Sequence, residues 1–173
     1  MKQVVVAGCC RTPQGTHGGA LKDVPAQRLG EIVFRETLKR TGVDPATIDE
    51  VILGCIAQPS EAANIGRVVA LMSGVPKEVT GYTVARNCAT GLEAIASAWR
   101  AIQAEEGEMY LVGGTESMSN IPYLVKGARW GLKLRHSVFV DALWEGLTDP
   151  ICNQIMGRTA ENVAELYDIS RDA

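Results

Sequence analysis

One cysteine of the 173-residue sequence stands where a thiol could act as a nucleophile. Cys88 follows a stretch over 80–86 that is typical of a strand, and a stretch with helical periodicity begins at Thr90. A strand-to-helix turn holds its side chains at the carboxyl end of a sheet, where open α/β folds bind ligands. The dipole and the unpaired N–H groups of the helix start would shift the thiol toward the reactive thiolate and could hold an oxyanion.

Two neighbours of Cys88 fit such a turn. Thr90 can supply a capping hydroxyl at the start of the helix. Gly91 omits a side chain where we expect the helix to approach the sheet closely. The other interpretation is that Cys88 is a buried apolar residue, as most free cysteines are. A helix dipole without a proton acceptor activates a thiol only in part, so position alone leaves both interpretations open.

The apolar pattern predicts strands and helices that would position this turn. The predicted strands are rich in small or β-branched residues and lie at 3–10, 51–55, 80–86 and 109–112, the first of them buried on both faces. The predicted helices lie between them: one opened by Asp23 and Pro25 and ended by Gly42, one capped by Asn64 and ended by Gly74, and one over 90–105. Strands that alternate with helices indicate the α/β class, with a parallel or mixed sheet covered by helices.

Composition excludes several classes of function. Net charge is −3, which argues against nucleic acid or an anionic membrane as a partner, because both require a basic surface. No apolar run is long enough for a membrane helix. Five irregularly spaced cysteines and only two histidines favour a reducing cytoplasm over a disulfide framework, and they indicate no metal site.

The character of the sequence changes after Thr115. Residues 116–156 show no sustained periodicity, although they contain Trp130 and Trp144. A long aperiodic segment in a compact protein is usually functional or an assembly element. Helical periodicity resumes near Thr159.

Five motifs, in chain order, resemble those of the thiolase family. They are Arg11-Thr12-Pro13 with Gly18-Gly19, Asn87-Cys88-Ala89-Thr90-Gly91-Leu92-Glu93-Ala94-Ile95, Gly113-Gly114-Thr115-Glu116-Ser117-Met118-Ser119, Pro122-Tyr123 with Ala128-Arg129-Trp130-Gly131, and Met156-Gly157-Arg158-Thr159-Ala160-Glu161-Asn162-Val163-Ala164. Each motif alone has weak to moderate specificity. Together they span the whole chain and are very specific.

The resemblance implies a thiolase-like αβαβα fold of five layers built from two similar halves. Residues 1–118 would form an incomplete N-terminal α/β domain, and residues 119–173 would form the truncated start of the loop domain. Residues 123–141 would be the tetramerisation loop of the family's tetrameric branch, with a plain surface loop as the alternative. The complete protein would be a homo-oligomer, either a dimer or a homotetramer.

The resemblance also implies an acyltransferase whose nucleophile is Cys88. Cys88 would attack an acyl-CoA, form an acyl-enzyme intermediate and release CoA. Condensation of two acetyl-CoA would give acetoacetyl-CoA, and the reverse reaction would cleave a 3-oxoacyl-CoA with CoA, as in fatty acid metabolism. Coenzyme A thioesters are substrates here, so no cofactor and no metal are implied. Met156 would lie near the acyl pocket, with core filling as an equal alternative.

Parts of the family's machinery are missing from these 173 residues. The family's activating histidine in a G-H-P motif and its second catalytic cysteine in a C-x-G motif do not occur, and His17 and His136 are expected to be surface residues. Because the G-H-P histidine and the C-x-G cysteine are missing, we expect the chain as given to be incomplete and inactive alone. Ile155 stands where the biosynthetic branch often has histidine, which argues against the short-chain assignment.

Two alternatives to a thiolase stay open. The first is a ketoacyl-synthase-like condensing enzyme, against which the E-S-M-S and T-A-E-N motifs argue. The second is a non-catalytic half-thiolase that acts as an acyl-CoA-binding or partner-binding module. The second alternative predicts no acyl group on Cys88 even when the second half of the fold is supplied, so a catalytic thiolase and a non-catalytic module can be told apart by experiment.

Overall fold

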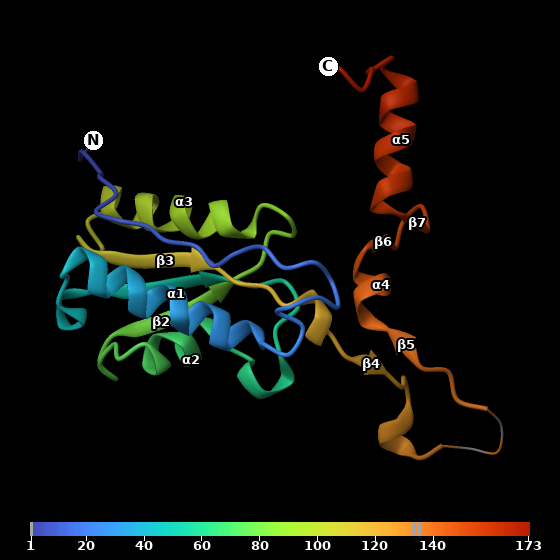
Figure 1. Cartoon of the computed structure of the whole chain (residues 1–173), viewed down its shortest axis with the longest axis horizontal. Helices are drawn as coiled ribbons and strands as arrows, with labels where there is room; N and C mark the ends of the chain where they lie inside the picture. Colours follow the sequence, from blue (N-terminus) through green and yellow to red (C-terminus); the bar gives the residue numbers. More distant parts are fainter. Residues whose placement is uncertain (1, 133, 135) are drawn as a thin grey trace. The chain divides into compact units, whose positions relative to one another are not determined.

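The computed structural model describes residues 2–132, 134 and 136–173, and the chain divides into two compact units (Figure 1). The first unit is Met1–Asn120 and the second is Ile121–Ala173. Within the described ranges, no helix is long and apolar enough to cross a membrane.

A three-stranded parallel sheet forms the centre of the first unit. Its strands are β1 (Glu50–Gly54), β2 (Thr80–Val84) and β3 (Tyr110–Gly114), in the spatial order β2-β1-β3. All three strands run in the same direction, so their carboxyl ends meet at one edge of the sheet. This carboxyl edge is where the sequence predicts a ligand site.

Successive residues of β1 point to opposite faces of the sheet. Val51 and Leu53 belong to one core cluster with α1 (Ala26–Thr41) and α2 (Ile65–Met72). Ile52 instead packs with residues of α3 (Thr90–Gln103) on the other face. Figure 1 shows this layering, with α3 on one side of the strands and α1 and α2 on the other. The central strand is therefore buried on both faces, as parallel sheets require.

The ends of the helices confirm most of the predicted signals. The Asn64 side chain accepts a hydrogen bond from the backbone N–H of Arg67 at 3.2 Å and so caps α2. Gly42, with φ of 68°, ends α1 in the left-handed conformation that glycine adopts readily. The prediction that Asp23 opens α1, as an acidic cap before a proline in the first turn, is wrong, because Pro25 itself precedes the helix and no side chain caps it.

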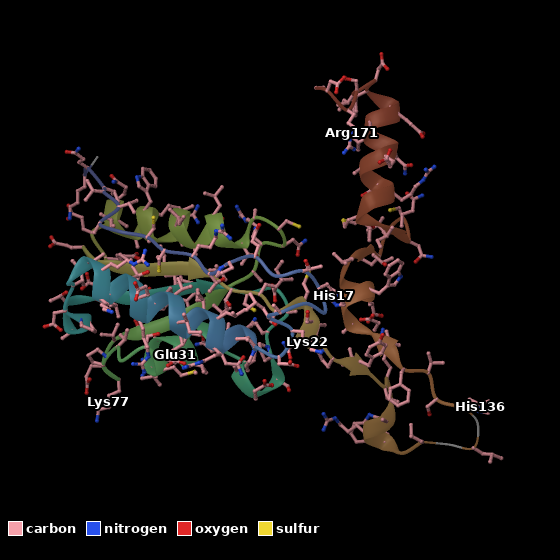
Figure 2. All side chains as sticks on the ribbon, in the orientation of Figure 1. His17, Lys22, Glu31, Lys77, His136 and Arg171 are labelled. Carbon is pink, nitrogen blue, oxygen red and sulfur yellow. The ribbon has the colours of Figure 1, made fainter. Side chains whose placement is uncertain are left out.

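One buried carboxylate lies on α1. It belongs to Glu31, which is labelled in Figure 2. Its side chain is paired with Arg28 one turn before it and with Arg35 one turn after it. The Arg35 Nε–Glu31 Oε1 distance is 2.8 Å. The hydrogen bond from Arg28 is the main cause that holds the pKa of Glu31 below its usual range, against the opposing effect of burial.

The predicted strand at 3–10 is wrong. The segment forms no strand, and Val5 and Val6 are 75% and 80% exposed. Residues 8–12 line a cavity of about 210 Å³ together with residues 112–116 of β3 and its following loop. No backbone hydrogen bond joins residues 8–12 to residues 112–116. The apolar composition favours an extended backbone, whereas a strand also requires a neighbouring backbone with which to share hydrogen bonds.

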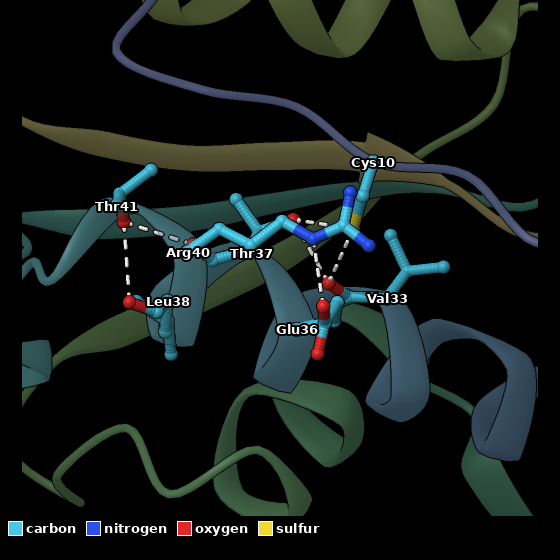
Figure 3. Close-up of polar contacts among 7 residues, drawn as sticks. All are labelled: Cys10, Val33, Glu36, Thr37, Leu38, Arg40 and Thr41. Atoms are coloured by element: carbon cyan, nitrogen blue, oxygen red, sulfur yellow. Dashed lines mark hydrogen bonds and ion pairs between the residues drawn. The ribbon is translucent and has the colours of Figure 1, made fainter.

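Side chains hold this N-terminal segment in place instead. The backbone N–H of Lys2 donates to Gln103 Oε1 on α3 at 3.0 Å. The thiol of Cys10 donates to the Val33 carbonyl on α1 at 3.1 Å and lies 2.9 Å from the Thr37 hydroxyl (Figure 3). The segment is therefore attached at its two ends and has no strand pairing between them.

The second unit contains short elements before one longer helix. Its strands pair antiparallel, β4 (Tyr123–Leu124) with β5 (Val140–Asp141) and β6 (Thr148–Asp149) with β7 (Gln154–Ile155). Its helices are α4 (Ala142–Gly146) and α5 (Met156–Leu166). Asp141 caps α4 by accepting from the backbone N–H of Leu143 at 2.9 Å. The helix predicted near Thr159 thus begins slightly earlier, at Met156.

Candidate active site

Cys88 lies in the turn between β2 and α3, at the carboxyl edge of the parallel sheet. β2 ends at Val84 and α3 begins at Thr90, as the sequence predicts to within two residues. The thiol of Cys88 is exposed and does not belong to either core cluster. In this structure the side chain is therefore open to a reagent or substrate.

The turn around Cys88 is tight and includes an unusual backbone conformation. Asn87 has a φ of 44°, in the left-handed region that asparagine tolerates better than most residues with a side chain. The backbone N–H of Ala89 donates to the Arg86 carbonyl at 3.1 Å, and that of Thr90 donates to the Asn87 carbonyl at 3.0 Å. These two bonds reverse the chain between strand and helix within five residues, 85–89.

The Thr90 hydroxyl closes the same turn. The buried Oγ1 accepts a hydrogen bond from the backbone N–H of Arg86 at 2.7 Å and donates one to the Asn87 carbonyl at 2.6 Å. The N-cap residue of α3 is Ala89, which has no capping side chain. The expected role of Thr90 as a helix cap is therefore wrong, and its hydroxyl bonds to the turn instead.

Several backbone N–H groups near Cys88 are unpaired. In the structure as described, no residue accepts a hydrogen bond from the backbone N–H of Cys88, Gly91 or Leu92. The first such bond into the helix runs from the N–H of Glu93 to the Ala89 carbonyl at 2.9 Å. The free groups belong to a helix start and are available to an oxygen that develops negative charge beside the thiol.

Two strand glycines allow α3 to start this close to the sheet. A Cβ atom at Gly54 of β1 would lie 2.4 Å from Thr90 Cγ2 and 2.9 Å from the Thr90 carbonyl oxygen. A Cβ atom at Gly114 of β3 would lie 3.3 Å from the Cα of Gly91. A Cβ atom at Gly91 itself would meet nothing within 4 Å, so the predicted need for glycine at that position is wrong. The close approach depends on the strands, not on the helix.

The charges beside the turn are paired. Glu93 in the first turn of α3 lies 2.9 Å from Arg86 Nη1 and also pairs with Arg100. The hydrogen bond from Arg100 lowers the pKa of Glu93, and the positive charge of Arg86 adds to this effect. The carboxylate near Cys88 is thus ionised and neutralised by two cations.

Glu116 joins two loops at the carboxyl edge. Its carboxylate accepts from the backbone N–H of Ile56 at 2.9 Å and of Ala57 at 3.3 Å, so the loop after β3 holds the loop after β1. The sequence motif contains Glu116, but no local pattern identifies a partner sixty residues away.

A second cysteine lies at this edge and has a different environment. Cys55 is buried, and its thiol donates to Glu116 at 3.5 Å. Burial first, and then the nearby Glu116 carboxylate, raise the pKa of Cys55 to about 12. Such a thiol stays protonated at neutral pH, so Cys88 is the better candidate nucleophile of the two.

The other candidate residues lie on the surface of their own units. Met156 is the first residue of α5 in the second unit and is 41% exposed. His17, in a loop of the first unit, and His136, in the second unit, are both exposed, as expected (Figure 2). The role of Met156 at an acyl pocket stays a prediction.

The sequence matches the family described as "Thiolase, N-terminal domain" over residues 4–173. The chain belongs to the thiolase family. A curated thiolase-family relative, the acetyl-CoA acetyltransferase of Syntrophomonas wolfei, is 41% identical over 174 aligned residues, which cover 99% of this chain and 44% of that protein. The chain therefore spans less than half the length of the curated relatives it matches.

Solved structures of the thiolase family have the same fold. The crystal structure of the Bacillus anthracis acetyl-CoA acetyltransferase matches with a TM-score of 0.91 at 47% identity, over 96% of this chain and 42% of that one. The human mitochondrial 3-ketoacyl-CoA thiolase in complex with CoA matches with a TM-score of 0.89 at 40% identity, over 95% and 42%. These matches confirm the predicted thiolase-like α/β fold.

Proposed function

We propose that this chain provides the nucleophile of a thiolase-type acyltransferase and that Cys88 forms the acyl-enzyme. The observation that carries the proposal is the exposed Cys88 thiol at the start of α3, beside unpaired N–H groups, within the thiolase-family motif. The names of the relatives, acetyl-CoA acetyltransferase and 3-ketoacyl-CoA thiolase, support acetyl-CoA and 3-oxoacyl-CoA as substrates.

The proposed reaction begins with attack by the Cys88 sulfur on the thioester carbonyl carbon. A new C–S bond forms, and the carbonyl oxygen becomes an oxyanion. The donors that we propose for this oxyanion are the unpaired N–H groups closest to the thiol along the chain, those of Cys88 and Gly91. The bond to the CoA sulfur then breaks, and CoA leaves as the thiol with the proton that Cys88 gave up. In the condensation direction, a base outside these 173 residues takes the α-proton of a second acetyl-CoA, and the resulting carbanion attacks the acyl carbon; in the cleavage direction, the CoA sulfur attacks it. In both cases the bond between Cys88 Sγ and the acyl carbon breaks, and the Cys88 thiolate is restored.

Acetylation of Cys88 tests this proposal directly. The purified chain is incubated with acetyl-CoA, digested, and each cysteine peptide is weighed by mass spectrometry. We expect an acetyl group on Cys88 and not on the exposed Cys9 and Cys152, and no acetylation at this position in Cys88→Ser. Equal labelling of the three exposed cysteines, or no label on Cys88 even when the second half of a thiolase is added as a separate polypeptide, would support the non-catalytic half-thiolase instead.

We further propose that the 173 residues alone do not turn over. The family's G-H-P histidine and C-x-G cysteine are not in the sequence, so an acyl-enzyme would have no partner residues for the second half-reaction. Thiolysis of acetoacetyl-CoA by the purified chain checks this. Turnover comparable to that of a full-length relative would contradict it.

The second unit supports an assembly role for residues 123–141. The paired β4 and β5 close a loop whose apolar side chains are exposed, including Trp130 at 87% and Phe139 at 69%. Exposed apolar patches mark interaction surfaces, so we infer that this segment, at the start of a loop domain, mediates homo-oligomer formation. Light scattering of the chain and of a Trp130→Ser variant tests this: an association that the variant does not weaken would count against it.

A cytoplasmic location is also proposed. All five cysteines are free in the described structure, including the adjacent Cys9 and Cys10, and Cys9, Cys88 and Cys152 are exposed. Exposed thiols persist in a reducing compartment. Fractionation of cells that express the tagged chain tests the location, and recovery with secreted or membrane fractions would contradict it.

A further inference from the structure

We infer that Thr90 is a positioning residue for Cys88, because its hydroxyl holds the strand-to-helix turn in the shape that presents the thiol to the N–H groups of α3. This inference rests on the proposed role of Cys88 as the nucleophile. Thr90 itself is buried, and among the described residues its hydroxyl bonds only to backbone groups of the turn.

One oxygen atom of Thr90 bonds to two residues that precede Cys88. Oγ1 accepts from the backbone N–H of Arg86 at 2.7 Å and donates to the Asn87 carbonyl at 2.6 Å. The same Asn87 carbonyl also accepts the backbone N–H of Thr90 at 3.0 Å. Cys88 therefore lies in a loop of chain that is closed on one side by Arg86 and Asn87 and on the other by Thr90.

This turn depends on such contacts because its backbone is not the preferred one. Asn87 has a φ of 44°, a conformation that costs energy for a residue with a side chain, although less for asparagine than for most. The described residues offer no other side chain that hydrogen-bonds to the backbone of residues 86–88. Loss of the Thr90 hydroxyl would leave the Arg86 N–H without an acceptor and free the turn to relax.

The Thr90 side chain is itself fixed by the sheet. Its methyl group lies where a Cβ atom at Gly54 of β1 would meet it at 2.4 Å, so the side chain packs directly against the backbone of the central strand. Contact with β1 orients the hydroxyl, and the hydroxyl orients the turn. The position of Cys88 relative to the sheet is thereby fixed through Thr90.

Two substitutions separate the hydroxyl from the shape of the side chain. Thr90→Val keeps the branched shape and removes both hydrogen bonds, whereas Thr90→Ser keeps the hydroxyl and removes the methyl group. Thr80→Val is the matched control, because Thr80 is an exposed threonine at the other end of β2. The readout is the rate at which iodoacetamide alkylates Cys88 in the folded 173-residue chain, relative to Cys152, by peptide mass spectrometry.

We expect Thr90→Val to slow alkylation of Cys88 relative to Cys152 by about fivefold, the low end for two lost hydrogen bonds, because the relaxed turn no longer holds the thiol beside the free N–H groups. We expect Thr90→Ser and Thr80→Val to stay within about twofold of the wild type. Equal rates in the wild type and Thr90→Val would overturn the inference. A Thr90→Ser variant as slow as Thr90→Val would overturn it as well, because the methyl group would then be the cause. If Thr90→Val does not fold, amide exchange decides: Arg86 must be protected in the wild type and in Thr90→Ser, and fast exchange there refutes the inference.

Acetylation by acetyl-CoA separates this inference from the proposed function. A wild-type Cys88 that is never acetylated, together with the expected alkylation pattern, would remove the nucleophile proposal and leave the positioning role of Thr90. Equal acetylation of Cys88 in the wild type and in Thr90→Val would support Cys88 as the nucleophile and would contradict the positioning role of Thr90.

Discussion

Glu116 Oε2 lies 2.9 Å from the backbone nitrogen of Ile56, and this contact joins the loop after β3 to the loop after β1. The other carboxylate oxygen accepts from Ala57 at 3.3 Å and lies 3.5 Å from the Cys55 sulfur. Both loops start from the edge of the sheet that carries Cys88. A single carboxylate therefore fixes two segments of the candidate site with respect to each other.

Replacement of Glu116 by alanine should loosen the loop after β1. The N–H groups of Ile56 and Ala57 would lose their acceptor, and we expect the free energy of unfolding in urea to fall by about 1–3 kcal/mol. Amide exchange at both residues should accelerate. Glu78→Gln, at an exposed position, is the control and should change neither measurement. A Glu116→Ala variant with unchanged exchange at Ile56 would show that the contact does not hold the loop.

Cys55 should make stability fall in alkaline solution. Its pKa is raised to about 12 in the folded chain, above the usual value near 8.5 of an unfolded thiol. The contribution of Cys55 to the free energy of unfolding is therefore fully present below about pH 8.5. It is lost as the pH rises toward 12, by at most about 1.4 kcal/mol per pH unit, because the unfolded thiol ionises first. Urea unfolding at pH 8 and pH 10 should show a smaller loss in Cys55→Ala than in the wild type. Identical losses would mean that the Cys55 thiol loses its proton as readily in the folded chain as in the unfolded chain.

Gly54 and Gly91 should respond in opposite ways to alanine. Gly54→Ala places a Cβ atom 2.4 Å from Thr90 Cγ2, so we expect a loss of about 1–3 kcal/mol and slower alkylation of Cys88. Gly91→Ala meets nothing within 4 Å and should gain about 0.5 kcal/mol from the higher helix propensity of alanine. Thermal unfolding monitored by circular dichroism measures both. A neutral Gly54→Ala would mean that α3 can move away from β1 without cost.

Glu31 should contribute to stability down to acid pH. Because its pKa is lowered in the folded chain by the hydrogen bond from Arg28 and then by Arg35, its contribution is present above about pH 4.3 and is lost as the pH falls through the folded value. Glu31→Gln should destabilise the chain by about 1 kcal/mol at pH 7, since both arginine partners are more than half exposed, and the difference should shrink toward pH 3. Glu36→Gln, at an exposed pair on the same helix, is the comparison: the hydrogen bond from Arg40 also lowers the pKa of Glu36, but exposure makes the pair weak, so we expect a smaller loss at pH 7 than for Glu31→Gln.

The features that the sequence predicts correctly are local ones. The strand-to-helix turn at Cys88 follows from a change of periodicity between 80–86 and 90–105, and the limits of α2 follow from Asn64 and Gly74 beside it. These signals lie within a few residues of the element that they define. For that reason the sequence alone predicts the position of the candidate nucleophile, without the contacts that surround it.

The features that the sequence does not predict depend on segments far apart in the chain. Residues 3–10 have the composition of a strand, but composition does not supply a hydrogen-bonding neighbour. The need for glycine falls on Gly54 and Gly114, and not on Gly91, because close approach is set by the crossing of α3 over two strands. The partner of Glu116 is likewise decided by the meeting of two strand ends.

The outer side of β3 pairs with no strand in the described structure, and the neighbouring residues 3–10 also leave their backbone groups unbonded. Such open rows of N–H and C=O groups are templates for strands from other molecules. A net charge of −3 gives only weak repulsion between copies. Turbidity of the isolated chain should therefore rise with its concentration, and kinetic work on it belongs in dilute solution.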